Sequence, residues 1–142
     1  MVRGYFGGNM CRCLFCMVAK GKLETNLVYE DETVMAFLDI EPINEGHVLI
    51  IPKEHYMDVD ELPQPLLFHL MEISQRIVTA IKMKYNADGY SIMQNGGKFN
   101  DIGHYHLHIF PRFEGDGFGW TSNTDIHNVN SEIAREIGNV LI

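Results

Sequence analysis

The sequence predicts an α+β fold, with an antiparallel β-sheet, one long helix and short helices towards both ends of the chain. Short apolar, β-branched segments are separated by turn residues, one segment carries an apolar stripe at helical spacing, and no strand–helix–strand rhythm is present. With 142 residues, 46% of them apolar and 21% charged, the chain has the composition of one globular domain. We expect residues 1–10, with three glycines, to form a flexible lead-in, and residues 11–142 to form the single domain.

The first half of the domain is predicted to contain one helical turn and three strands. The helical turn covers Cys13–Lys20 and ends at Gly21. The remaining elements are expected in this order: strands at 27–30 and 34–38 joined by an acidic turn, a loop at 39–46, and a buried strand at 47–51 that Pro52 stops.

The second half is predicted to begin with the long helix, after Pro63 or Pro65. The apolar stripe that predicts this helix consists of Leu66, Leu70, Ile73, Ile77 and Ile81. The segment 86–89 ends the helix. The elements that follow are a strand at 90–94, a turn at 95–97, a strand at 104–110 and a terminal helix at 130–141 capped by Asn130 or Ser131.

The charge and the hydrophobic pattern exclude two classes of partner. A net charge of −8 disfavours a sequence-independent nucleic-acid binder, which needs a basic face to neutralise phosphates. No apolar run approaches the roughly 20 residues of a membrane helix, and the N-terminal apolar stretch is too short for a signal peptide. We therefore expect a cytoplasmic protein that binds neither nucleic acid nor membrane.

Three histidines of the strand at 104–110 are the most informative residues. On a strand His104, His106 and His108 share one face, a register unlikely for ordinary core or surface histidines. The outer two lie about 13 Å apart, whereas zinc–nitrogen bonds are about 2.0–2.1 Å long, so one ion cannot bind all three. A neutral imidazole is also a nucleophile suited to covalent catalysis at phosphorus or a carbonyl group.

These histidines match the His-φ-His-φ-His-φ-φ signature, and the chain resembles the histidine triad (HIT) family of nucleotide hydrolases and transferases. The resemblance extends over residues 13 to 112 and is of the bacterial type with an N-terminal Cys-x-x-Cys. Segments 36–40 and 46–55 resemble the family's nucleoside-binding strand, loop and following strand, and Asn95-Gly96-Gly97 resembles its phosphate turn. The fold expected is accordingly HIT-like.

The resemblance implies roles for four catalytic histidines. His106 resembles the nucleophile that carries the nucleoside monophosphate, and a hydrogen bond from one of its ring N–H groups to a backbone carbonyl would fix its tautomer. His108 resembles the partner that binds the phosphate and helps to protonate the leaving group. His47 resembles the supporting fourth histidine, and His104 is the first member of the triad.

The resemblance also implies a nucleotide-binding set. Asp39 resembles the carboxylate that accepts hydrogen bonds from the ribose hydroxyls, with Ile40 against the base; the alternative for Asp39 is a simple turn former. Asn95, Asn100 and Gly103 are expected near the phosphate, although Asn100 stands where many members have glutamine and this loop is shorter than in many members. The alternative for the glycines is a plain hairpin turn. Arg112 reaches either the distal phosphate or only solvent.

The remaining motif is Cys13-x-x-Cys16, whose spacing suits two thiolates on one zinc ion. No βαβ pattern follows it, so a thioredoxin-like redox motif is disfavoured. The resemblance implies that His55 and His104 complete the site. Four protein ligands make a closed, structural Zn²⁺ site. The alternative is a pair of buried free cysteines.

Three functions follow from these residues. The first is a hydrolase that releases a nucleoside monophosphate, AMP, from a phosphoramidate or a dinucleoside polyphosphate through a nucleotidyl-histidine intermediate. The second is a nucleotidyl transferase or phosphorylase with the same nucleophile. The third is a nucleotide-binding regulatory module. The intact middle histidine favours an enzyme, and the resemblance implies a purine nucleotide substrate and a homodimer.

Overall fold

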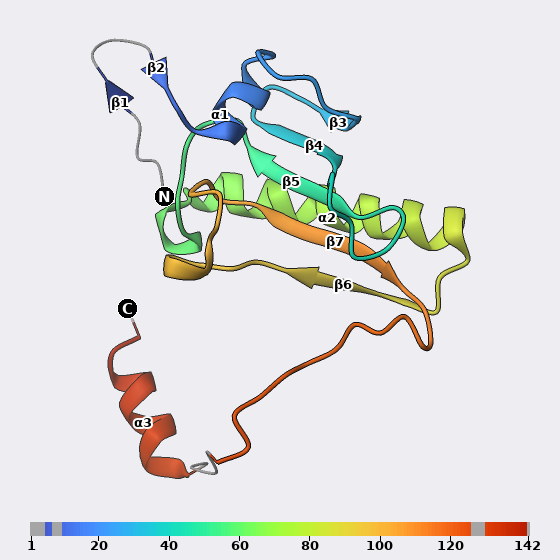
Figure 1. Cartoon of the computed structure of the whole chain (residues 1–142). Coiled ribbons are helices and arrows are strands. Elements are labelled where there is room, and N and C mark those ends of the chain that lie inside the picture. The colour runs from blue at the N-terminus through green and yellow to red at the C-terminus, as the bar shows by residue number, and fades with distance from the viewer. Residues whose placement is uncertain (1–4, 7–9, 126–129, 142) are drawn as a thin grey trace.

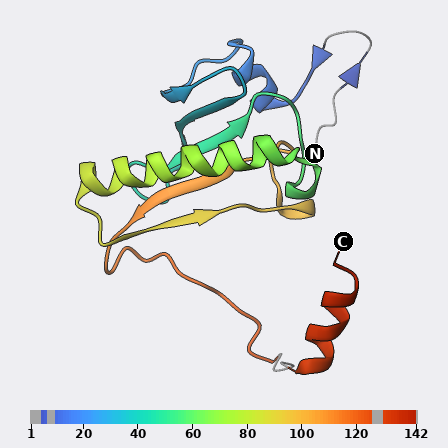
Figure 2. The ribbon, with the colours of Figure 1, turned by 180° about the vertical axis from the view of Figure 1, so that it is seen from behind.

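A five-stranded antiparallel sheet lies between one long and one short helix (Figures 1 and 2). The structure, a computed structural model, describes residues 5–6, 10–125 and 130–141. The strands are β3 (Leu27–Glu30), β4 (Val34–Leu38), β5 (Val48–Pro52), β6 (Gly89–Met93) and β7 (Leu107–Arg112), in the order β3-β4-β5-β7-β6. All neighbouring strands are antiparallel, so the predicted α+β class is confirmed.

The long helix α2 (Gln64–Tyr85) covers one face of this sheet (Figure 2). The predicted apolar stripe is the face that packs: four of its residues are buried and Leu66 is partly buried. These side chains pack against alternate residues of β4, β5 and β7, and each buried Leu or Ile contributes about 1.5–3 kcal/mol. Asn86, with a φ of 45°, ends the helix in the left-handed region.

The short helix α1 (Leu14–Ala19) packs on the opposite face. Its buried residues contact the other alternate set of strand residues, Met35, Phe37, Leu49 and Ile51. All five residues of β5 are buried because helices cover both of its faces, as the continuous apolar pattern predicts. Gly21 adopts a φ of 72°, which explains why the helical turn ends there.

Several smaller elements complete the described chain. They are β1 (Tyr5–Phe6), β2 (Met10–Cys11), the 3₁₀ turns η1 (Val59–Glu61) and η2 (Gly97–Phe99), and α3 (Ser131–Asn139). The side chain of Asn130 caps α3, as predicted. The antiparallel pair β1–β2 falls within the expected lead-in, but residues 1–4 and 7–9 lie outside the described residues. None of the described helices is long and apolar enough to cross a membrane.

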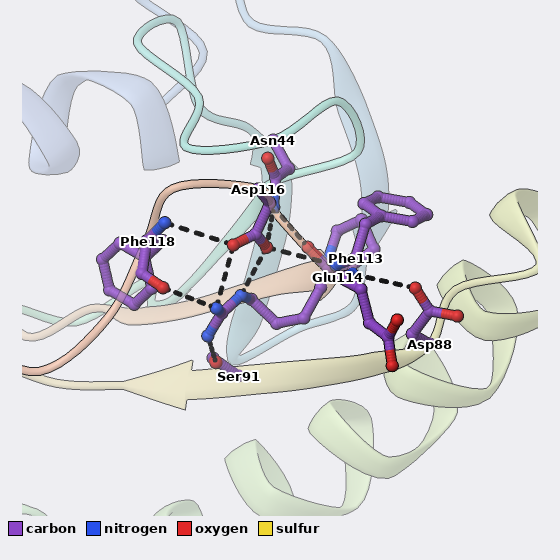
Figure 3. Close-up of polar contacts among 9 residues, drawn as sticks. Asn44, Asp88, Ser91, Phe113, Glu114, Asp116 and Phe118 are labelled. Atoms are coloured by element: carbon purple, nitrogen blue, oxygen red, sulfur yellow. Dashed lines mark hydrogen bonds and ion pairs between the residues drawn. The ribbon is translucent and has the colours of Figure 1, made fainter.

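A salt bridge fastens the chain that leaves β7 (Figure 3). The Arg112 guanidinium donates to both carboxylate oxygens of Asp116, at 2.6 and 3.0 Å, to Ser91 Oγ and to the carbonyl oxygen of Phe118. The amide of Asn44 donates to the same carboxylate at 3.0 Å. Neither alternative for Arg112 included this ion pair with Asp116, in which the arginine side chain stays 27% exposed, and the choice between a distal phosphate and solvent stays a prediction.

A second polar link joins α2 to the turn between β3 and β4. His69 Nε2 donates to Asp31 Oδ2 at 2.6 Å, and this hydrogen bond, with a second from His69 Nδ1 to Glu72 Oε2 at 3.3 Å, raises the pKa of His69. Burial by itself would raise the pKa of Asp31, but hydrogen bonds from His69, Tyr29 and backbone N–H groups outweigh it and hold that pKa well below its usual range. The link is thus strongest when His69 is protonated.

Replacing His69 with glutamine is expected to destabilise the protein in a pH-dependent way. Because the folded pKa lies above the unfolded value of about 6.5, the full stabilisation is present below pH 6.5 and is lost as the pH rises through the folded pKa. Urea titrations should show a deficit of about 0.5–1 kcal/mol at pH 5.5 that shrinks by pH 9. Lys53→Gln, which breaks the Lys53–Glu30 pair, is the control without this dependence. An equal deficit for His69→Gln at both pH values would contradict the assignment.

Candidate functional site

A cavity of about 620 Å³ opens on the α1 side of the sheet. Its wall includes three of the predicted catalytic histidines, His47, His106 and His108, together with Asp39 and Ile40. The volume is within the range of small-molecule sites in proteins, about 300–1,000 Å³. Side chains of α1 and of strands β4 and β5 supply most of the apolar wall.

The histidine segment is only partly a strand. The sequence predicts a strand from His104, but β7 begins at Leu107. The physical reason is that Tyr105 donates its N–H to the carbonyl oxygen of Tyr56, outside the sheet. The alternation of faces nevertheless persists: Tyr105 and Leu107 point into the α2 core, while the His106 and His108 rings lie on the other side, with centroids 4.8 Å apart.

His106 is held in one tautomer. Its side chain is 2% exposed, and its Nδ1–H donates to the carbonyl oxygen of His104 at 2.8 Å. Since a carbonyl oxygen only accepts, Nε2 of the neutral ring carries the free lone pair. The Phe15 ring contacts the imidazole edge-on at 5.3 Å and helps to fix its orientation. The ring therefore presents a nucleophilic nitrogen towards the cavity.

His47 and His108 form a hydrogen-bonded chain beside His106. The backbone N–H of Ile43 donates to His47 Nδ1 at 3.0 Å, so the proton of the neutral His47 ring is on Nε2. That Nε2–H donates to His108 Nδ1 at 3.0 Å. The remaining proton of neutral His108 is then on Nε2, where it can be donated to a bound ligand.

Both rings are neutral near pH 7. Burial lowers the pKa of His47, against the opposing effect of Asp39. Burial, assisted by the neighbouring His106 and His47, lowers the pKa of His108 to about 4. The lowered pKa of each ring supports the neutral tautomers assigned to the hydrogen-bonded chain.

Asp39 lies where β4 ends, next to this chain. Its Oδ1 accepts the N–H of Glu41 at 2.9 Å, so the carboxylate does form the turn that the alternative interpretation proposed. Its Oδ2 lies 3.6 Å from His47 Nε2 and 3.9 Å from His108 Nδ1. The side chain also lines the cavity, as does the strongly exposed Ile40. The turn interpretation and the ligand-binding interpretation are compatible.

The expected phosphate residues are not brought into this cavity. Asn100 is buried, donates to the carbonyl oxygen of Met57 at 3.1 Å and accepts the N–H of Gly103 at 3.0 Å. Asn95 is exposed, and neither it nor Gly103 lines the cavity within the described chain. Asp101 lines it instead, 3.9 Å from His106 Nε2, and sequence reasoning missed this residue. Nothing in the local pattern distinguishes Asp101 from its neighbours.

The remaining predicted catalytic histidine, His104, belongs to a second cluster and is not among the described residues that line the cavity. The possible ligand atoms of Cys13, Cys16, His55 and His104 all lie within 4.8 Å of one another. His104 Nδ1 is 3.4 Å from Cys13 Sγ and 3.5 Å from Cys16 Sγ, and His55 Nδ1 is 3.2 Å from Cys16 Sγ. A tetrahedral zinc ion with bonds of about 2.3 Å to sulfur and about 2.0–2.1 Å to nitrogen separates such atoms by about 3.6 Å.

The surroundings of this cluster also suit a metal ion. His104 is fully buried and donates its Nε2–H to the carbonyl oxygen of Pro52 at 2.8 Å, so its Nδ1 lone pair faces the sulfurs. Such an outer hydrogen bond is usual for a metal-bound histidine. Burial lowers the pKa of His104 to about 4, which keeps the ring neutral. The cluster can therefore bind a metal ion.

Comparisons with known proteins agree with the fold. The HIT domain family model matches residues 20–115. An uncharacterized HIT-like protein of Methanocaldococcus jannaschii is 42% identical over 85% of this chain and 98% of its own length. An adenosine 5'-monophosphoramidase of Saccharomyces cerevisiae is 37% identical over 88% of this chain and 80% of its own.

A solved structure of a metal-bound protein is also similar to this chain. A zinc-bound histidine triad family protein from Mycobacterium smegmatis superposes with a TM-score of 0.72 and 36% identity, over 80% of this chain and 84% of that one.

Proposed function

We propose, because this chain belongs to the HIT family, that it is a hydrolase that releases AMP from adenosine phosphoramidates or dinucleoside polyphosphates. The observation that carries the proposal is the free Nε2 of His106, directed at a nucleotide-sized cavity by the hydrogen bond from Nδ1 to His104. The yeast relative described as an adenosine 5'-monophosphoramidase supports adenine and a P–N bond.

The reaction proposed has two displacements at phosphorus. The His106 Nε2 lone pair forms a bond to the α-phosphorus, and the P–N or P–O bond to the leaving group breaks with its electron pair on the leaving atom. His108 Nε2–H is placed to donate a hydrogen bond to the phosphate or to the leaving atom. In the second displacement a water molecule attacks phosphorus and the bond from phosphorus to His106 Nε2 breaks. Over both steps this water supplies the hydroxyl group on phosphorus and the proton on the released leaving group. AMP is released and His106 is regenerated.

We further propose that Asp39 Oδ2 accepts hydrogen bonds from the ribose and that Ile40 contacts the base. Asp39→Ala is expected to weaken AMP binding by about 1.5–3 kcal/mol, roughly 10- to 150-fold, because a charge-assisted hydrogen bond is lost. Binding of 2′,3′-dideoxy-AMP should change little, as measured by calorimetry. Glu45→Ala, in the same exposed loop, is the control. Equal losses for both nucleotides would leave Asp39 with its turn role alone.

For the second cluster we propose a structural zinc ion bound by Cys13, Cys16, His55 and His104. Its support is the tetrahedral spacing of two sulfurs and two nitrogens and the zinc-bound Mycobacterium smegmatis protein. A zinc ion with four protein ligands cross-links the chain and has no open coordination position for a substrate. The ligands would tie the start of α1 to the first histidine of the triad, whose carbonyl group orients His106.

We also propose that the chain forms a homodimer. Large apolar side chains are exposed on α2 and on the edge strand β6, which pairs only with β7 among the described strands. These residues are Phe68, Met71, Met83, Tyr90 and Ile92. An apolar helix face beside a free strand edge is suited to association with a second copy.

A further inference from the structure

The cavity that holds His106 is lined by several acidic side chains. Four carboxylates line it, and within the described residues no lysine or arginine does. The carboxylates are those of Glu24, Asp39, Glu41 and Asp101. The chain as a whole has a net charge of −8, so no general positive potential compensates for them.

Of these four carboxylates, Asp101 lies close to the proposed nucleophile, His106. Oδ1 of Asp101 lies 3.9 Å from His106 Nε2, the atom proposed to attack phosphorus. Asp39, proposed to hold the ribose, lies at the other side, within 4 Å of His47 and His108. With a nucleoside bound at Asp39, the exposed side chain of Asp101 is placed to reach phosphorus substituents other than the nucleoside.

Arg112 could have balanced the charge of an anionic leaving group, but it is already paired with Asp116. The Arg112 guanidinium is bound to both oxygens of Asp116 (Figure 3). The side chain of Asp101, by contrast, is 84% exposed and can turn towards a ligand. His106 Nε2, on a ring that is 2% exposed, faces the same space.

We propose that Asp101 selects nucleotide conjugates whose leaving group carries a positive charge, such as phosphoramidates of diamines. The inference rests on the proposed function and narrows its substrate class. A carboxylate near the leaving group attracts an ammonium group and repels a carboxylate or a polyphosphate chain. The preference for cationic over anionic substrates is therefore the sum of this attraction and this repulsion. Because Asp101 is exposed, the effect is screened by salt.

Three adenosine 5′-phosphoramidates of nearly equal size test the proposal. Their amines are 1,2-diaminoethane, propylamine and β-alanine, which give cationic, neutral and anionic leaving groups. For the wild-type protein we expect kcat/KM to fall in that order, with the cationic substrate favoured over the anionic one by at least about tenfold at low salt. Added salt at 0.5 M should reduce the ratio severalfold.

The variant Asp101→Asn removes the charge and keeps the shape. We expect it to lower the cationic-to-anionic ratio by about tenfold, because the cationic substrate loses an attraction and the anionic substrate loses a repulsion. Glu132→Gln, the same charge change on α3, away from the sheet in Figures 1 and 2, should leave the ratio unchanged.

Three results would overturn the inference. A wild-type ratio near one, or a ratio that Asp101→Asn leaves unchanged, removes the selectivity. An equal loss for all three substrates makes Asp101 a positioning group for His106. Failure of the proposed function is distinguishable from these: the wild-type protein would then cleave none of the three substrates and form no nucleotidyl-histidine.

Discussion

Replacement of His106 is expected to lower the turnover of adenosine phosphoramidate by at least about a thousandfold, because no other group supplies the attacking lone pair. His106→Asn is the sharper variant, since its amide can still donate to the His104 carbonyl oxygen without offering a nucleophilic nitrogen. AMP affinity should change by less than about threefold, because Asp39 and Ile40 remain in the cavity. The His69→Gln protein, changed outside the cavity, should keep its turnover.

The covalent intermediate gives an independent measurement. Phosphorus–nitrogen bonds on histidine are acid-labile, so the reaction is stopped in alkaline denaturant with a labelled substrate and the label is located by mass spectrometry. We expect the label on His106. A label on His104 or His108, or substantial turnover by the His106 variants, would contradict the assignment and favour a binding module or a metal-dependent hydrolase.

Loss of the metal cluster is expected to have the largest effect on stability. Wild-type protein should contain about one zinc ion per chain by elemental analysis. Cys13→Ser should lower that content and destabilise the fold by at least about 3 kcal/mol, or roughly 10 °C in Tm, since the remaining buried ligands lose their common partner. Turnover at saturating substrate should change little while the variant is folded, because the ion is not the attacking group.

Cys11→Ser is the matched control for this experiment. Cys11 ends β2 and is not one of the four ligands proposed for the zinc ion. Its replacement should leave zinc content and Tm near the wild-type values. Full zinc occupancy in Cys13→Ser would remove Cys13 from the site, and absence of zinc from the wild-type protein would favour a pair of buried free cysteines.

The sheet and the long helix could be predicted from the sequence because their patterns are local. Residues 27–30 and 34–38 form strands with the predicted limits, and the stripe from Leu70 to Ile81 is the buried face of α2. A hydrogen bond from the His106 ring to a backbone carbonyl was also expected, although the sequence specified neither Nδ1 as the donor nor His104 as the acceptor. Short-range regularities of this kind need no knowledge of the tertiary structure.

The loop before the triad could not be predicted, because distant residues determine its conformation. Asp58 accepts the N–H of Gly97, and the carbonyl oxygen of Met57 accepts the amide of Asn100, across separations of 39 and 43 residues. These contacts turn Asn100 inwards and leave Asp101 at the cavity. The motif resemblance assigned phosphate contacts to this loop by position alone, and a position does not specify which way a side chain turns.

The hydrogen bond from Ile43 to His47 has a consequence for how the site can change during evolution. The main-chain N–H of residue 43 determines which ring nitrogens of His47 and His108 carry protons. This group does not titrate, and nineteen of the twenty amino acids supply it. The side chain at position 43 is thus free to drift without reversing that order. Only proline at this position, which has no main-chain N–H, would remove the hydrogen bond, so the backbone and not a side chain sets the proton order of His47 and His108.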